Sequence, residues 1–167
     1  MDETVMDHEL SDIEALDHLH DGGDYRRLAQ RTASADVLRE LARCDYPFVW
    51  HAIAGNPAAP SDLLAALAGR RHSTYNDNRL LLLLSEHPAG TGAALDALLD
   101  TVAGRLRDGE RPYAAVLNLA RRSDVPAERV RSLGRLPGAS ARLRRGITRA
   151  LAARPGPCRR AVTPSPS

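Results

Sequence analysis

An internal repeat constrains the fold of this 167-residue chain more than any other feature of its sequence. Residues 53–68, 84–99 and 119–134 align without gaps, offset by 31 and 35 residues. In each segment an apolar helix end precedes a polar or proline-containing break, and two apolar residues three positions apart follow the break. Each segment therefore predicts a helix, a tight turn and a second helix with one buried stripe. The stripes consist of Leu64 with Leu67, Leu95 with Leu98, and Val130 with Leu133.

Incomplete copies of the same pattern flank the three aligned segments. A looser copy covers residues 28–41, and a truncated one begins at Leu151. Aromatic residues make up only 4% of the chain, which favours close packing of slender helices over a β-sheet. We therefore expect an all-α fold, namely a short right-handed α-solenoid of about four and a half helix–turn–helix repeats with an N-terminal capping helix.

Local punctuation sets the expected limits of these parts. Residues 1–20 read as an acidic amphipathic capping helix, residues 25–155 as the α-helical repeat domain, and residues 156–167 as a disordered tail rich in Pro, Ser and Arg. A polar residue stands where an N-cap is needed before each second helix. These N-cap candidates are Ser34, Ser61, Thr91 and Asp124, and Pro47 and Pro112 fit the first turns of first helices.

Residues 45–68 resemble one unit of the variant leucine-rich repeats, which are relatives of HEAT-type α-solenoids. The similarity rests on an acidic residue before the first helix, an Ala-Ile-Ala-Gly-Asn-Pro helix end, a second proline at Pro60, and a Leu-Leu-x-x-Leu-Ala close. The resemblance implies stacked helix pairs that bind a protein, or in some members nucleic acid, along one face. Some relatives carry iron–sulfur clusters, which need a cysteine cluster that this sequence lacks, and no catalytic residue is carried over.

Cysteine usage and hydropathy indicate the compartment. Cys44 and Cys158 lie too far apart for a metal-binding pair and read as reduced thiols. No apolar run approaches the roughly 20 residues of a membrane span, and the first twelve residues are acidic where a signal peptide would be basic. All 23 basic residues other than histidine are Arg, which is typical of a GC-rich genome. We expect a cytoplasmic bacterial protein that does not insert into a membrane.

No arrangement of residues predicts catalysis or a cofactor. His8, His18 and His20 lie near acidic residues and could serve as metal ligands. However, side chains two positions apart on a helix, such as His18 and His20, point about 200° apart and cannot bind one metal ion together. Cys44 and His51 are separated by a proline break that leaves their geometry undefined, and no glycine-rich phosphate-binding loop is present. We therefore expect no enzyme activity, no metal and no cofactor.

Charge is strongly segregated along the sequence. Residues 1–24 contain nine acids and no Arg, whereas residues 105–160 contain fifteen Arg and four acids. An Arg-rich surface attracts an acidic protein or a phosphate backbone. The alternatives are that these arginines merely solvate helix faces, or that they pair with the acidic N-terminus of another copy. The candidate partner-binding arginines are Arg121, Arg122, Arg131, Arg142, Arg144 and Arg145.

The aromatic residues around position 48 are the second candidate site. Tyr46 and Trp50 are candidate binding anchors if exposed. Phe48 and Trp50 face nearly opposite ways on one helix, so one of them can lie in the core and the other can be exposed; the alternative is plain core packing of both. Together these features predict a non-catalytic protein-interaction or scaffolding module, with a nucleic-acid-binding repeat protein as the alternative. A continuous basic groove would favour nucleic acid, and a mixed face with exposed aromatic side chains would favour a protein partner.

Overall fold

The computed structural model describes residues 14–154, and all regular secondary structure within that range is helical. The predicted all-α fold class is therefore confirmed. A short helical turn at residues 14–16 precedes the other helices. These are α2 (Gly22–Arg31), α3 (Ala35–Leu41), α4 (Pro47–Ala54), α5 (Ser61–Ala68), α6 (Thr74–Glu86), α7 (Gly92–Arg107), α8 (Tyr113–Arg121), α9 (Ala127–Leu133) and α10 (Ala141–Ala152).

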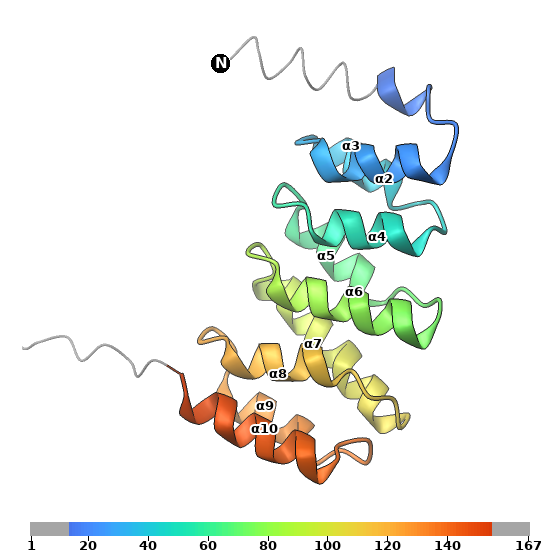
Figure 1. The fold of residues 1–167 in the computed structure, drawn as a ribbon. Coiled ribbons are helices and arrows are strands. Elements are labelled where there is room, and N and C mark those ends of the chain that lie inside the picture. The colour runs from blue at the N-terminus through green and yellow to red at the C-terminus, as the bar shows by residue number, and fades with distance from the viewer. Residues whose placement is uncertain (1–13, 155–167) are drawn as a thin grey trace, which may run out of the picture.

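The helices form two layers, with successive helices alternating between them (Figure 1). In the first layer, which faces the viewer in Figure 1, α4 packs on α2, α6 on α4, α8 on α6 and α10 on α8. The second layer contains α3, α5, α7 and α9, and α5 and α7 make its most extensive contact. Each second-layer helix also packs against the first-layer helix that precedes it in the chain.

The core lies between the layers and contains the stripes that the repeat predicts. Leu64 and Leu67 of α5 and Leu95 and Leu98 of α7 are buried, as are Val130 and Leu133 of α9. The first layer contributes the facing side chains, which are mainly Leu and Ala with few aromatic residues. Among them are Leu28, Val49, Ile53, Leu80, Leu84, Val116, Leu119, Leu143 and Ile147.

Helix starts agree with the sequence at three positions and differ at three others. Ser34 caps α3 by accepting from the Val37 N–H, Thr91 occupies the N-cap of α7, and Pro47 is the first residue of α4. The N-caps predicted at Ser61 and Asp124 are wrong, because prolines take the position immediately before both helices, and Pro112 likewise precedes α8 rather than lying in its first turn. Proline has no N–H and its φ is fixed, so it fits the residue before the first helical turn. The prolines are Pro60 before α5, Pro112 before α8 and Pro126 before α9.

The two ends of the sequence are covered only in part. Most of the capping helix predicted for residues 1–20, and all of the tail predicted for residues 156–167, lie outside the described residues. Asp21 caps α2, with its carboxylate accepting from the Asp24 N–H. Across residues 14–154, none of the helices has the length and apolar character needed to cross a membrane.

Polar side chains at the ends of the first-layer helices tie each repeat to the preceding one. Asn56 donates to the carbonyl oxygens of Ala29 and Thr32, each at 2.8 Å. His87 Nε2 lies 2.8 Å from the Asn56 carbonyl oxygen, so this nitrogen carries the proton. These bonds satisfy backbone carbonyls that a helix end leaves without a partner.

Arginines perform the same task in the later repeats. Arg122 donates to the carbonyls of Ser85 at 3.1 Å and Gly90 at 2.8 Å. Arg154 donates to the carbonyls of Ala120 at 2.8 Å and Val125 at 2.7 Å. In the repeat alignment Asn56, His87, Arg122 and Arg154 occupy one position, so we name these four residues the carbonyl ladder.

A buried ion cluster supports the start of α6. Arg105 of α7 is only 4% exposed and lies 3.5 Å from the carboxylate of Asp77, which is 5% exposed. Glu110 pairs with Arg105 at 3.4 Å and with Arg71 at 2.7 Å. Removing one partner of such a cluster leaves a buried charge uncompensated. Arg105 therefore has a structural role.

Candidate binding surface

The two layers differ in charge although both contain arginines. The five first-layer helices carry nine arginines and three acids, whereas the four second-layer helices carry five arginines and six acids. Neither α4, α8 nor α10 contains an acidic residue. The asymmetry that the sequence suggests between its two ends thus becomes an asymmetry between two faces of the molecule.

Second-layer arginines are mostly paired with acids across neighbouring helices. Arg39 of α3 bonds Asp62 of α5 at 3.1 Å. Arg129 of α9 bonds Asp96 of α7 and lies 3.5 Å from Asp100 on the same helix. These pairs neutralise much of the second layer and leave it with little charge for a partner to recognise.

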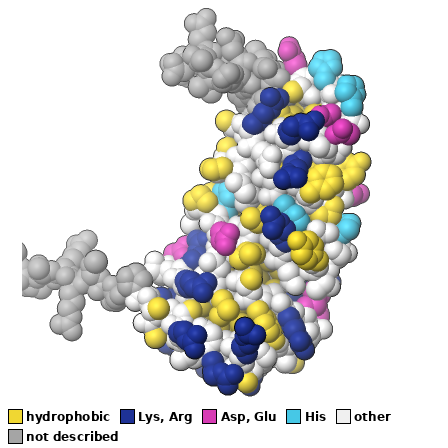
Figure 2. All heavy atoms as spheres, viewed as in Figure 1, with side chains coloured by type: hydrophobic (Ala, Val, Ile, Leu, Met, Phe, Trp, Pro, Cys, Tyr) yellow, Lys and Arg dark blue, Asp and Glu magenta, His cyan; other side chains and the backbone are white. Residues whose placement is uncertain are grey.

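First-layer arginines form a row with no such compensation. Within residues 14–154, eight exposed first-layer arginines take part in no ion pair. Arg31 lines a cavity at the N-terminal end of the stack and Arg144 donates to the Ala139 carbonyl, and the other six form the row. Figure 2, drawn from the same side as Figure 1, shows dark blue side chains at intervals down this face, most densely over α10. We name this row the arginine face. It contains Arg26 of α2, Arg79 of α6, Arg121 of α8, and Arg142, Arg145 and Arg149 of α10.

The arginines that the sequence proposed as a binding stripe are divided among different positions. Arg121, Arg142 and Arg145 belong to the arginine face. Arg122 belongs to the carbonyl ladder, and Arg131 pairs with Glu128 on α9 of the second layer. Arg144 is exposed on α10 and donates to the Ala139 carbonyl at 2.8 Å. The structure therefore does not bring the six predicted arginines together in one stripe.

The two candidate aromatic anchors also separate. Trp50 is 4% exposed, its indole N–H donates to the Cys44 carbonyl at 2.7 Å, and Arg70 lies over its ring at 5.1 Å. Trp50 is therefore part of the core, but Phe48 is 39% exposed, so the alternative that both side chains pack in the core is wrong for Phe48. Tyr46 is 47% exposed and stacks on Phe48 with ring centroids 5.3 Å apart. Tyr25 of α2 meets Tyr46 edge to face at 6.1 Å.

A groove of about 230 Å³ crosses α2, α4 and α6 on the same face. Phe48, Ala52 and Leu83 give it apolar walls, and Arg26 and Arg79 flank them. His51 also lines the groove, and its Nε2 lies 3.0 Å from the Asn76 carbonyl oxygen. Partial burial lowers the pKa of His51, and the Arg79 charge lowers it further, although the bond to Asn76 acts in the opposite direction.

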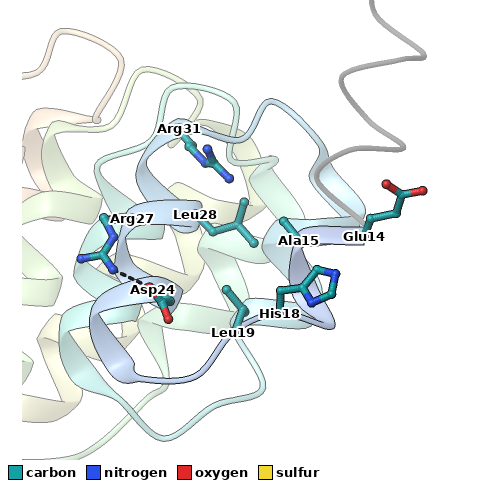
Figure 3. A pocket seen from close by; sticks show the side chains of 8 residues that line it. All are labelled: Glu14, Ala15, His18, Leu19, Asp24, Arg27, Leu28 and Arg31. Carbon is teal, nitrogen blue, oxygen red and sulfur yellow. Dashed lines mark hydrogen bonds and ion pairs between the residues drawn. The ribbon is translucent and has the colours of Figure 1, made fainter.

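A larger cavity, of about 510 Å³, lies at the N-terminal end of the stack. Figure 3 shows Leu28 of α2 pointing toward Ala15 and Leu19, with the ion pair between Arg27 and Asp24 beside them. His18 also lines this cavity. No set of three or more His, Cys, Asp or Glu side chains in residues 14–154 is placed to hold a metal ion, and His8 lies outside that range.

The sequence did not identify several of these residues as candidates, because few features of the sequence distinguish them. Arg26 and Arg79 lie outside the Arg-rich third of the chain, so composition alone did not single them out. The carbonyl ladder had a stronger signal, since the repeat alignment places a hydrogen-bond donor at the same position in four repeats. Cys44, considered as a nucleophile, is half-buried, and this burial raises the pKa of its thiol.

This face combines exposed guanidinium groups, exposed aromatic side chains and a small apolar groove. The guanidinium groups can attract a charged partner, and the groove can bury one of its side chains. No protein family, curated protein or solved structure matches the chain.

Proposed function

We propose that this chain is a short right-handed α-solenoid of about four and a half helix–turn–helix units that acts as a non-catalytic protein-interaction module in the bacterial cytoplasm. Two observations support the solenoid. Residues 45–68 resemble a unit of the variant leucine-rich and HEAT-like repeats, and successive helices alternate between two layers. The carbonyl ladder supports it further, because one bonding scheme recurs from repeat to repeat.

The observation that carries the proposed function is the arginine face. Guanidinium groups without ion-pair partners repel one another, and ion pairs like those of the second layer would relieve that repulsion. A row of such groups across four helices is favourable when an acidic partner neutralises it. The arginine face therefore binds a protein partner with an acidic surface or segment, and the exposed Tyr46 and Phe48 beside it supply apolar contact area.

Binding of a nucleic acid is the second candidate function. Arg121, Arg142, Arg145 and Arg149 lie on the adjacent helices α8 and α10, whose residues include no acid. Such a cluster also attracts phosphates, with an affinity that falls linearly in the logarithm of the salt concentration. We rank this function second because the face is mixed: Phe48, Leu83 and Glu86 interrupt the row of arginines on α4 and α6.

Two triple variants with equal loss of charge test the proposed function. R142Q/R145Q/R149Q removes three charges from the arginine face, and R39Q/R129Q/R131Q removes three from the paired second layer. A partner is first identified by cross-linking in cells that express the full chain, and the binding of the isolated partner is then measured. At roughly 0.5 kcal/mol per exposed charge, we expect the first variant to weaken binding by about tenfold.

The second-layer variant should bind within about twofold of the parent, because its arginines already have partners. Equal binding by all three proteins would reject the arginine face as the binding surface. Tight binding of oligonucleotides that is steeply salt-dependent and lost in R142Q/R145Q/R149Q would favour the second candidate function.

A further inference from the structure

The groove across α2, α4 and α6 lies at the end of the arginine face where charge is sparse. One helix, α4, contributes no charged residue to this region, and it supplies Phe48 and Ala52 to the groove instead. Leu83 of α6 completes the apolar lining, and no acidic residue lines the groove. A cavity of about 230 Å³ is smaller than the roughly 300–1,000 Å³ of small-molecule sites. Its size suits one side chain.

Phe48 is held firmly in this groove although its side chain is 39% exposed. Tyr46 stacks on one face of the ring, with an interplanar angle of 16°. The tip of the ring abuts Gly22 so closely that a Cβ atom at that position would lie 2.6 Å from Cζ. A fixed, partly exposed aromatic side chain loses little conformational entropy on binding, which is typical of an anchor site.

From these observations we infer that the groove binds one apolar side chain of an acidic peptide and so sets the specificity of the arginine face. This inference rests on the proposed protein-binding function. Arg26 and Arg79 stand at the two sides of the groove, within reach of carboxylates that flank the inserted side chain. A nucleobase fits less well, because Tyr46 already stacks on one face of Phe48 and leaves less of the ring free for a base to stack on.

The stacking of the first layer gives the peptide an expected pattern. Neighbouring packed helices lie about 8–10 Å apart, and an extended chain advances about 3.3 Å per residue. A peptide that leaves the groove at α6 and continues across α8 and α10 therefore meets a new helix about every three residues. Acidic side chains about three and six positions after the apolar residue would reach Arg121 and then Arg145.

The experiment uses the full chain and two labelled peptides of the same length. One peptide has a single Leu flanked by Glu, with Glu at every third position after it and Ser elsewhere; in the other, Ala replaces the Leu. Fluorescence anisotropy should give about tenfold tighter binding of the Leu peptide to the parent chain. F48A should remove most of that preference, whereas R79Q should weaken the binding of both peptides, because both carry the flanking Glu residues.

Y75A is the matched control, since Tyr75 is a 75%-exposed aromatic residue of α6 that does not line the groove. Y75A should keep the preference for the Leu peptide. Thermal melting checks that F48A folds, and R79Q independently tests the contact with the flanking carboxylates, because Arg79 is exposed. A preference that persists in F48A, binding of the Leu peptide by R79Q as tight as by the parent, or a preference that Y75A abolishes would overturn the inference.

Failure of this inference can be told from failure of the proposed function. If the two peptides bind equally and R142Q/R145Q/R149Q weakens both, the arginine face binds acidic chains while the groove selects nothing. If neither peptide binds, the proposed function fails as well. Because residues 2–12 of the chain are acidic too, the titration is repeated on D2N/E3Q/D7N/E9Q/D12N, which should show the same preference; its loss would count against the inference.

Discussion

Arg129 and Arg79 illustrate how differently the two layers treat one residue type. Arg129 of α9 contacts Asp96 and Asp100, which stand one turn apart on α7. Arg79 of α6 belongs to no ion pair within residues 14–154, and the charged side chain that shares its groove is another arginine, Arg26. Arginine content therefore does not locate a binding surface in this molecule. The proposed binding surface is identified instead by arginines that have no ion-pair partner.

Arginines that bond backbone carbonyls also differ from the exposed ones. Arg122 and Arg154 point into the junctions between repeats and bond carbonyl oxygens, whereas Arg121, one residue earlier than Arg122, stays exposed. Neighbours in sequence thus have different tasks, one structural and one available for a partner.

Truncation of the shared core should affect both layers equally. Leu67→Ala in the second layer and Leu119→Ala in the first remove side chains that are 1% and 0% exposed. Each should lower the free energy of unfolding by about 2–5 kcal/mol in urea titrations, because a cavity remains. Y75A, at an exposed position, should change it by less than about 0.5 kcal/mol. Two separate unfolding transitions would show that the layers do not share one core.

Arg122→Ala should cost far more stability than Arg121→Ala. The Arg122 guanidinium donates hydrogen bonds to the carbonyl oxygens of Ser85 and Gly90. Arg122→Ala removes this charged donor. Loss of hydrogen bonds to a charged group predicts a decrease of about 1.5–3 kcal/mol in the free energy of unfolding, against less than about 0.5 kcal/mol for Arg121→Ala.

Arg122→Lys distinguishes the charge of Arg122 from its hydrogen-bonding geometry. Lysine keeps the charge but lacks the planar fork that reaches several carbonyls, so most of the loss should remain. Urea unfolding of the three variants measures the difference. Equal stability of Arg121→Ala and Arg122→Ala would contradict the division between the carbonyl ladder and the arginine face.

Arg129→Gln and Arg79→Gln compare a paired and an unpaired surface charge. Arg129→Gln breaks exposed ion pairs and should cost about 0.2–1 kcal/mol at low salt, with a smaller cost at about 1 M salt. Arg79→Gln should cost nothing measurable at either salt concentration. A cost for Arg79→Gln as large as that for Arg129→Gln would mean that the first-layer arginine has a stabilising partner.

Titration of His51 should have the smallest effect, on the pH dependence of the free energy of unfolding. The pKa of His51 is lowered in the folded chain, mainly by partial burial and also by Arg79, and Arg26 is the other charged side chain lining the groove with it. The unfolded chain, with an ordinary pKa of about 6.5, therefore takes up a proton first. The free energy of unfolding should fall as the pH drops through about 6.5 and level off below the folded-state pKa.

Two measurements isolate this contribution. The difference in pH dependence between the parent and H51Q in urea unfolding reports His51 alone. An NMR titration of the imidazole in R79Q should show its pKa shifted back up, because one cause of the lowering has been removed. An unchanged pKa in R79Q would show that Arg79 does not act on the groove.

Local patterns in the sequence predicted much of the fold. Apolar residues three positions apart identified the buried faces of α5, α7 and α9, since helical periodicity relates only residues within a few turns. Helix starts were predicted where a Ser or Thr cap was decisive, as at Ser34. They were missed at α5 and α9, where proline took the capping position.

The candidate surface was harder to predict from the sequence than the fold, as Arg122, Trp50 and Arg79 show. The sequence by itself determined an all-helical chain with repeating apolar stripes and an excess of arginines, because composition and periodicity act over short separations. Only the tertiary structure decided that Arg122 bonds carbonyls more than 30 residues earlier, that Trp50 is enclosed beneath Arg70, and that Arg79 stands without an acidic partner. Burial and neutralisation depend on which helices pack side by side, and that packing joins residues that no short stretch of the sequence places together.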